Sequence, residues 1–159
     1  MLKQASTADL KAGTVTRAAG LVVVAMRTYP RQITRTQRDE YLVDLSPDPQ
    51  LFRDFKDAER RLGDHDLAFA EVGYERRFQL NSSALSDLAR LARAAQDRDV
   101  FLVCQCAVGQ RCHRELLLMC ARRGFEADAE APRNAYPEFA ARLERAPPPE
   151  PRTSRWPRD

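Results

Sequence analysis

Two short runs of consecutive apolar residues constrain the fold of this chain more than any other feature. Residues 21–26 read LVVVAM, and residues 99–104 read DVFLVC, which is apolar after Asp99. Neither run alternates apolar with polar residues, as a strand with one face in water would. Each run is therefore predicted to be a strand covered on both faces. The sequence predicts an α/β fold, a compact three-layer sandwich with a small, mainly parallel sheet.

Helical patterns follow the first run. Thr36 begins a capping-box pattern that predicts a short helix reaching Leu45. Asp48 and Pro49 are typical of a helix start, and the apolar spacing after them predicts a helix that ends at Gly63.

Further segments are less sharply marked. Residues 14–16 and the first few residues are expected to form an edge strand. A helical stripe, weakened by Gly73, is formed by Leu67, Ala70, Tyr74 and Phe78. A helix capped by Ser82 or Ser83 is predicted to bury Leu85, Leu88, Ala89 and Ala92. A last helix is predicted over residues 115–123, with Leu116, Leu117 and Cys120 inward and Gly124 after its end.

Proline marks one boundary in the chain. Five of the ten prolines lie in residues 147–157, a segment with little apolar content apart from Trp156. Such a segment cannot bury enough surface to fold. In a chain of 159 residues, we therefore expect a single α/β domain over residues 1–145 and a disordered Pro/Arg-rich tail over residues 146–159.

Composition excludes several classes of protein. The excess of Lys and Arg over Asp and Glu gives a net charge of only +3, too small to indicate a nucleic-acid binder by bulk charge. No apolar run approaches the roughly 20 residues of a membrane helix, and the first residues lack the apolar stretch of a secretory signal. We therefore expect a cytoplasmic protein with no membrane partner, whose four cysteines are reduced thiols.

Residues 104–114 carry the densest chemistry in the sequence, between the second predicted strand and a helix. Ligands of open parallel sheets bind beyond the carboxyl ends of strands. A helix N-terminus favours anions and lowers the pKa of a nearby thiol. The candidate catalytic residues are Cys104, Cys106, Cys112 and His113, with a cysteine as the thiolate and His113 as the proton shuttle. Arg111 and Arg114 are candidates for binding an anion.

Three interpretations of these cysteines stay open. In the first, Cys104 or Cys106 is a nucleophile, and the spacing Cys106-x-x-Gly109-x-Arg111 is similar to the active-site loop of rhodanese-type sulfurtransferases. In the second, three thiols and an imidazole form a closed zinc site: Cys104, Cys106, Cys112 and His113. In the third, the thiols are small buried hydrophobes. Cys120 is expected to be of that third kind, and His65 to be a solvated loop residue.

A second basic loop follows the first predicted strand. It carries Arg27, Arg31 and Arg35, with Arg38 just beyond, and residues 27–38 contain no acidic residue. If the two strands are parallel neighbours, both loops leave the sheet at the same edge. Arg27 and Arg31 would then face the cysteine loop and form an electropositive, thiol-containing pocket.

Two separated motifs resemble one family. Residues 27–31 (RTYPR) and residues 41–47 (YLVDLSP) resemble the front half of the family called domain of unknown function 488 (DUF488), in its YeaO-like branch. Residues 102–117 are similar to the Cys…Cys-His-Arg motif of many other members. The resemblance covers about residues 20–123, and Cys106 and Gly109 have no counterpart in it. It implies a compact α/β cytosolic domain, supports the pocket and leaves the reaction open.

The sequence therefore predicts a small protein that acts on or binds an anionic ligand, such as a phosphate-bearing small molecule or a nucleotide. The anion-binding candidates are Arg27, Arg31, Arg111 and Arg114. The alternatives are rhodanese-like sulfur transfer, a module that binds nucleotides or nucleic acid, and structural zinc. No cofactor is expected, the zinc alternative apart.

Overall fold

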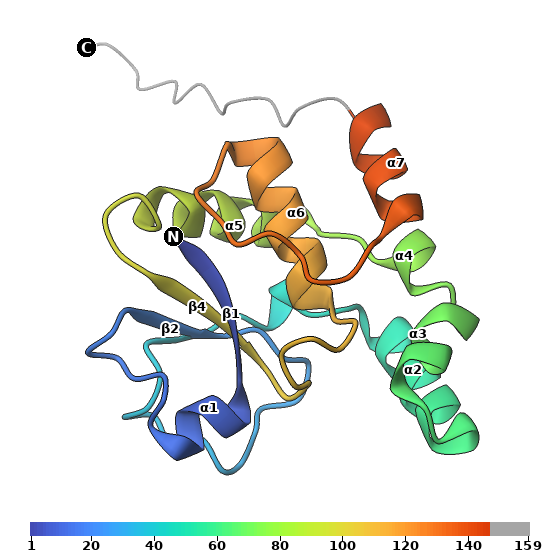
Figure 1. Ribbon diagram of the computed structural model, residues 1–159, viewed down its shortest axis with the longest axis horizontal. Coiled ribbons are helices and arrows are strands. Elements are labelled where there is room, and N and C mark those ends of the chain that lie inside the picture. Colours follow the sequence, from blue (N-terminus) through green and yellow to red (C-terminus); the bar gives the residue numbers. More distant parts are fainter. Residues whose placement is uncertain (147–159) are drawn as a thin grey trace, which may run out of the picture.

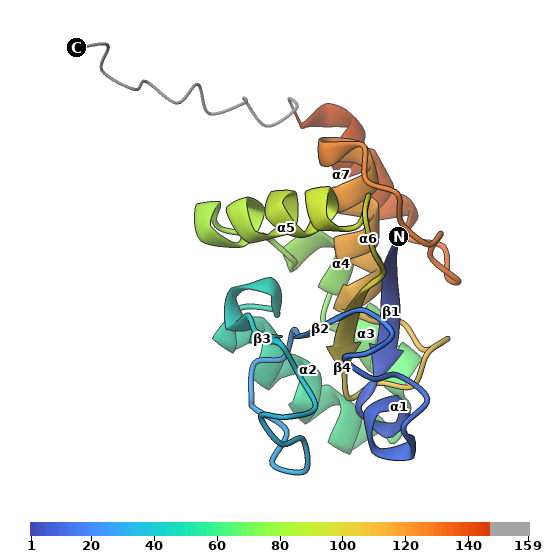
Figure 2. The same cartoon turned by 90° about the vertical axis from the view of Figure 1, so that its left-hand side faces the viewer.

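A four-stranded parallel sheet forms the centre of the computed structural model, which describes residues 1–146 (Figures 1 and 2). The strands are β1 (Leu2–Ser6), β2 (Leu21–Val24), β3 (Glu40–Tyr41) and β4 (Val100–Cys104), in the spatial order β1-β4-β2-β3. All three pairings are parallel. β4 is therefore an inner strand, as its unbroken apolar sequence predicts.

Helices cover both faces of the sheet, and a short 3-10 helix, η1 (Val43–Leu45), follows β3. The helices of the described residues are α1 (Thr7–Ala12), α2 (Pro49–Leu62), α3 (His65–Glu71), α4 (Tyr74–Arg77), α5 (Ser82–Ala94), α6 (His113–Phe125) and α7 (Pro137–Arg145). The predicted α/β fold with its parallel sheet is confirmed. No helix within residues 1–146 is both long and apolar enough to cross a membrane.

The strands alternate their side chains between two cores. Val100 and Leu102 of β4 join the larger core with α2 to α7. Phe101 and Val103 face the opposite way, into a smaller core with α1 and the loop after β2. Both faces of the sheet are covered by these cores, so every residue of β2 and β4 is buried. The Cys104 thiol, at the end of β4, is thereby held at the carboxyl edge of the sheet.

The prediction for α2 is confirmed at both ends. The Asp48 side chain accepts hydrogen bonds from the backbone N–H groups of Gln50 and Leu51, each at 2.9 Å. Gly63 ends the helix in the left-handed conformation, with φ of 66°. These signals lie within a few residues of the element that they specify.

The helix predicted from Thr36 to Leu45 is wrong. That segment contains β3 and η1. The backbone N–H of Asp39 donates to the Val22 carbonyl at 2.8 Å, and the Asp39 carboxylate accepts from the Val22 N–H at 2.8 Å. Pairing with β2, a partner distant in sequence, overrides the local capping pattern.

Other expectations hold only in part. The first residues form edge strand β1, but residues 14–16 are not a strand, because the N–H groups of Thr14 and Val15 bond the Asp9 carbonyl at the end of α1. The stripe from Leu67 breaks at Gly73, whose φ is 63°, and Leu67 is 59% exposed. The residues buried there are Ala68, Phe69, Tyr74 and Phe78.

The two long helices after the break are shifted from their predicted positions. Asn81 caps α5, in place of Ser82 or Ser83. The buried residues of α5 are Ala84, Leu88, Leu91 and Ala92, whereas Leu85 and Ala89 are half-buried. Helix α6 begins at His113 and continues through Gly124 to Phe125. The tail expected from residue 146 lies, except for Ala146, outside the described residues.

Candidate functional site

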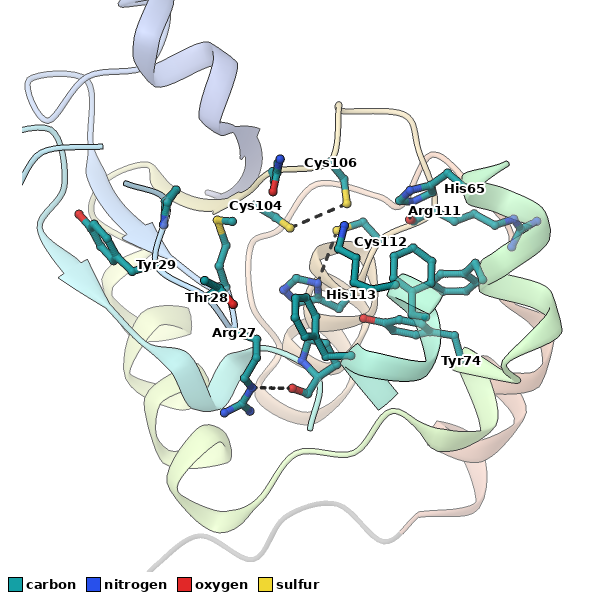
Figure 3. Close-up of a pocket in the computed structure, with 18 residues that line it drawn as sticks. Arg27, Thr28, Tyr29, His65, Tyr74, Cys104, Cys106, Arg111, Cys112 and His113 are labelled. Atoms are coloured by element: carbon teal, nitrogen blue, oxygen red, sulfur yellow. Dashed lines mark hydrogen bonds between the residues drawn. The ribbon is translucent and has the colours of Figure 1, made fainter. Parts of the chain in front are cut away.

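A cavity of about 150 Å³ opens beyond the carboxyl ends of β2 and β4 (Figure 3). The loop after β2 and the loop after β4 both line it, so the two distant segments meet as the topology predicts. The rest of its wall is largely aromatic, from Phe52, Phe55, Phe69 and Tyr74. Tyr74 stacks on Phe69 with a centroid distance of 4.2 Å. The pocket therefore combines polar chemistry at one end with an apolar wall.

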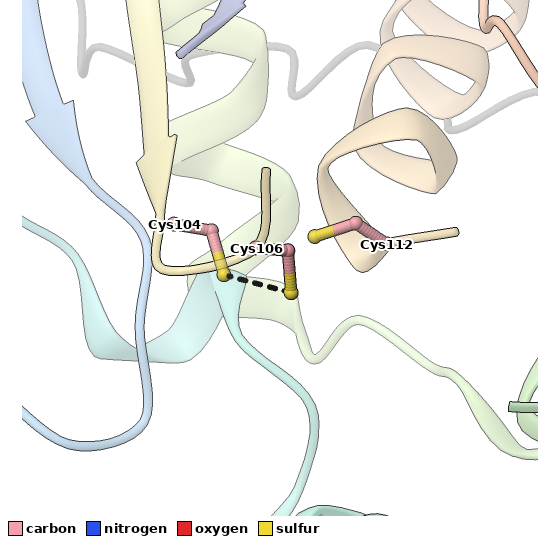
Figure 4. A group of neighbouring side chains, drawn as sticks. All are labelled: Cys104, Cys106 and Cys112. Carbon is pink, nitrogen blue, oxygen red and sulfur yellow. Dashed lines mark hydrogen bonds between the residues drawn. The ribbon is translucent and has the colours of Figure 1, made fainter. Parts of the chain in front are cut away.

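Three cysteines that line this pocket lie close together (Figure 4). Cys104 is the last residue of β4, Cys106 lies in the following loop, and Cys112 is the cap residue of α6. Their Sγ atoms all lie within 4.8 Å of one another, and those of Cys104 and Cys106 are 3.9 Å apart. Cys120 is remote from this cluster, further along α6.

The orientation of His113 fixes the tautomer of its neutral ring. Its Nε2 atom lies 2.6 Å from the backbone carbonyl of Ala25. Because a carbonyl can only accept, Nε2 must carry a hydrogen. In the neutral ring Nδ1 is then a free acceptor, and it lies 3.6 Å from Cys112 Sγ. The Cys112 proton can pass to Nδ1, leaving a thiolate beside an imidazolium.

The surroundings of Cys112 favour its charged form. Burial opposes ionisation, but hydrogen bonds from the Cys104 and Cys106 thiols, together with His113, lower the pKa of Cys112 well below its ordinary value. As the cap residue, its side chain also lies at the N-terminus of α6, whose dipole stabilises a negative charge.

The pKa values of the other two thiols, Cys104 and Cys106, are raised. The hydrogen bond with Cys106 lowers the pKa of Cys104, but the hydrogen bond with Cys112 and burial outweigh it and raise the pKa to about 12. Hydrogen bonds with Cys104 and Cys112, followed by burial, raise the pKa of Cys106. These directions favour ionisation of Cys112 over ionisation of Cys104 or Cys106.

Arg114 lies behind the cluster, with its side chain completely buried. Its guanidinium donates to the carbonyl of Ala5, to that of Cys106 at 2.8 Å and to that of Ala107 at 3.4 Å. The pKa of Arg114 is raised, because the attraction of the cysteines, Cys112 foremost, exceeds the effect of burial. Arg114 thus holds the cysteine loop to β1 and supports the thiolate from behind.

The other arginine candidates differ in position. Arg27 lines the pocket, and its Nε donates to the Pro47 carbonyl at 3.0 Å (Figure 3). Arg111 also lines it, while its Nη1 donates to the Ala135 carbonyl at 2.9 Å and its guanidinium lies over the Tyr136 ring. Arg31 is exposed and does not line the pocket.

His65, expected to be a solvated loop residue, belongs to this site. Its side chain is only 13% exposed. Nδ1 lies 2.8 Å from the Glu59 carboxylate and Nε2 lies 2.7 Å from the Arg111 carbonyl. His65 therefore joins α2 to the cysteine loop, a contact between residues 46 positions apart that no local pattern signals.

Tyr136 and Glu115 position the Cys112 backbone, and sequence reasoning missed both. The Tyr136 hydroxyl accepts from the Cys112 N–H at 3.2 Å and donates to the Glu115 carboxylate at 2.8 Å. That carboxylate also accepts from the Asn134 side chain at 2.6 Å and from the Arg133 N–H. A carboxylate in the first turn after a Cys-His-Arg motif was the one available signal.

The alternative of a closed zinc site is supported for three of its four ligands. The three cysteine Sγ atoms come together, whereas His113, with Nδ1 at 3.6 Å from Cys112 Sγ, is not part of that group. The set of donor atoms within 4.8 Å consists of the three cysteines alone. Three thiols could hold a soft ion with an open position, but they do not form a closed four-ligand site.

Comparison with known proteins connects this site to a family. A family model described as the active DUF488-N3 subclade matches residues 6–122, which include both loops and the whole cysteine cluster. No curated protein matches the chain significantly, and neither does any solved structure.

Proposed function

The chain belongs to the DUF488 family, and we propose that it is a thiol-dependent enzyme whose Cys112 thiolate attacks a small ligand held in the pocket. The matched subclade is described as active, which supports a chemical role for the site. Cys112, His113 and the pocket all lie within the matched residues or beside them.

The hydrogen bond between His113 and the Ala25 carbonyl carries this proposal. It leaves Nδ1 as the acceptor facing Cys112 Sγ. A thiolate is the nucleophilic form of cysteine, and an adjacent imidazole is a common means of generating it. Although Cys112 is only 2% exposed, it lines the cavity. A small reagent in the cavity can therefore reach it.

The pocket favours a ligand with both an apolar part and a negative charge. Aromatic rings form much of the wall, and Arg27, Lys56 and Arg111 supply cations from three different segments. Arg27 and Lys56 are half-buried, and Lys56 Nζ also pairs with the Glu59 carboxylate at 3.0 Å. We expect the apolar part to lie against the rings, with a carboxylate or phosphate near the cations.

Alkylation with iodoacetamide at a series of pH values tests this proposal. The rate constant for Cys112 should reach its plateau well below the free thiol pKa of about 8.5. Cys104 and Cys120, whose pKa values are raised to about 12, should react slowly at neutral pH. Trypsin cleaves after Arg111 and Arg114, so the label should be found on the peptide of residues 112–114.

Cys120→Ser is the matched control, because it removes a thiol outside the cluster. This variant should label as fast as the unmodified protein, whereas Cys112→Ser should lose the fast phase. Labelling of Cys112 only above the free thiol pKa would remove the basis for nucleophilic catalysis.

A further inference from the structure

The three sulfur atoms lie close enough for a second chemical step after Cys112 has reacted. We propose that Cys106 is a resolving thiol and that the substrate is a small disulfide with carboxylate groups: Cys106 attacks the mixed disulfide formed on Cys112 and closes a Cys106–Cys112 bond. This inference rests on the proposed nucleophilic role of Cys112. It adds a substrate class and a second reacting residue.

The two steps balance in atoms and electrons. The Cys112 thiolate attacks R–S–S–R, forms Cys112–S–S–R and releases R–S⁻. The Cys106 thiol then attacks Cys112 Sγ, forms the Cys106–Cys112 disulfide and releases R–SH with its proton. One substrate disulfide is reduced by two electrons, and the cysteine pair is oxidised by the same two. A separate dithiol reductant would reopen the pair for another turnover.

Geometry favours Cys106 over Cys104 as the resolving residue. A disulfide requires the sulfur atoms to approach to about 2.05 Å, from positions within 4.8 Å in this structure. Cys104 is buried at the end of the inner strand β4 and pairs with Ser6 of β1. Cys106 is half-buried in the loop beyond the sheet. Its sulfur can make the approach without disturbing strand pairing.

The charge on Cys112 also sets the order of the steps. While Cys112 is a thiolate, hydrogen bonds with Cys104 and with Cys112 raise the pKa of Cys106, which therefore stays protonated and does not compete. Formation of the mixed disulfide removes the charge of Cys112. Cys106 then ionises more readily, because one source of its raised pKa is gone.

The lining of the pocket suits a disulfide. Divalent sulfur packs favourably against aromatic rings, and Phe55, Phe69 and Tyr74 form a continuous edge-to-face and stacked group in the wall. Arg27 and Lys56 lie at the same cavity and match carboxylates on the ends of the substrate.

Dithiobis-nitrobenzoate, an aromatic disulfide with carboxylates, is a suitable probe. In single turnover at neutral pH, the protein should release two thionitrobenzoate anions per Cys112, and the first release should precede the second. Tryptic mapping should then show residues 99–111 joined to residues 112–114, with fragmentation placing the bond at Cys106. Elemental analysis of the same sample establishes whether a metal ion occupies the thiols.

Variants separate this inference from the proposed function. In Cys106→Ser the first release should be retained, the second should slow by at least about tenfold, and the adduct should remain on Cys112. Cys120→Ser should behave as the unmodified protein. A bond at Cys104, or an unchanged second release in Cys106→Ser, would overturn the resolving role while leaving the nucleophile intact. Absence of any adduct on Cys112 would overturn the nucleophile itself.

Discussion

At the scale of single residues, one backbone carbonyl determines which nitrogen of His113 faces Cys112. The Ala25 carbonyl orients His113 so that Nδ1 faces Cys112 Sγ. Cysteine and histidine were recognised in the sequence by their chemistry alone. The tautomer could not be predicted, because Ala25 and His113 are 88 positions apart.

Replacement of His113 by Gln should weaken the thiolate. Loss of the imidazole removes one of the groups that lower the pKa of Cys112. The pKa should therefore rise, and the pH at which the alkylation rate reaches its plateau should move upward. The iodoacetamide pH profile measures this effect. An unchanged profile would show that the neighbouring thiols suffice without His113.

Replacement of Tyr136 by Phe should destabilise the protein. The change removes a buried hydroxyl that links the Cys112 N–H to the Glu115 carboxylate. Leaving such groups without a partner costs about 1–3 kcal/mol. Urea unfolding measures the change in the free energy of unfolding. Tyr29→Phe is the control, because the Tyr29 hydroxyl is bonded to the Ile33 carbonyl in a half-buried position. Its free energy of unfolding should fall by less than that of Tyr136→Phe.

At the scale of elements, local signals were sufficient for some segments and failed for others. β2, β4 and α2 were predicted because their apolar runs and caps lie within the elements themselves. The region of β3 was mispredicted because its structure depends on pairing with β2. α6 begins two residues before the predicted start, and this shift places Cys112 at the cap position.

The cap of α2 offers a test at this scale. Asp48→Ala removes both hydrogen bonds to the first turn, and the free energy of unfolding should fall by about 1 kcal/mol. Asp57→Ala, at an exposed position of the same helix, is the control and should change it by less than about 0.5 kcal/mol. Equal effects of the two substitutions would contradict the assigned role of the cap. Urea denaturation provides the measurement.

At the scale of the whole molecule, the site exists because a parallel sheet brings two distant loops to one edge. The topology was predictable, and so was the meeting of Arg27 with the cysteine loop. The directions in which the other arginine side chains point could not be predicted from the sequence. Arg31 points into water, and Arg114 supports the loop from within, because carbonyls left by the end of β1 and by the loop required a donor.

A pair of reagents tests whether the pocket prefers anions. Iodoacetate and iodoacetamide have nearly the same size but differ in charge. The rate constant of iodoacetate at Cys112, divided by that of iodoacetamide, should fall in Arg27→Ala and at high salt. Both changes reduce the positive potential at the pocket. Arg31→Ala, outside the pocket, should leave the ratio unchanged. A ratio that depends on neither salt nor Arg27 would argue against anion recognition.

The central claim is that the loop after β2 and the loop after β4, where they meet, hold Cys112 as a thiolate at neutral pH. Ultraviolet thiolate absorbance, followed during a pH titration of the unmodified protein and of Cys112→Ser, measures that charge directly. The account predicts an absorbance step well below the free thiol pKa of about 8.5, and the loss of that step in Cys112→Ser. A first step at or above that pKa, or a low step that persists in Cys112→Ser, would contradict it.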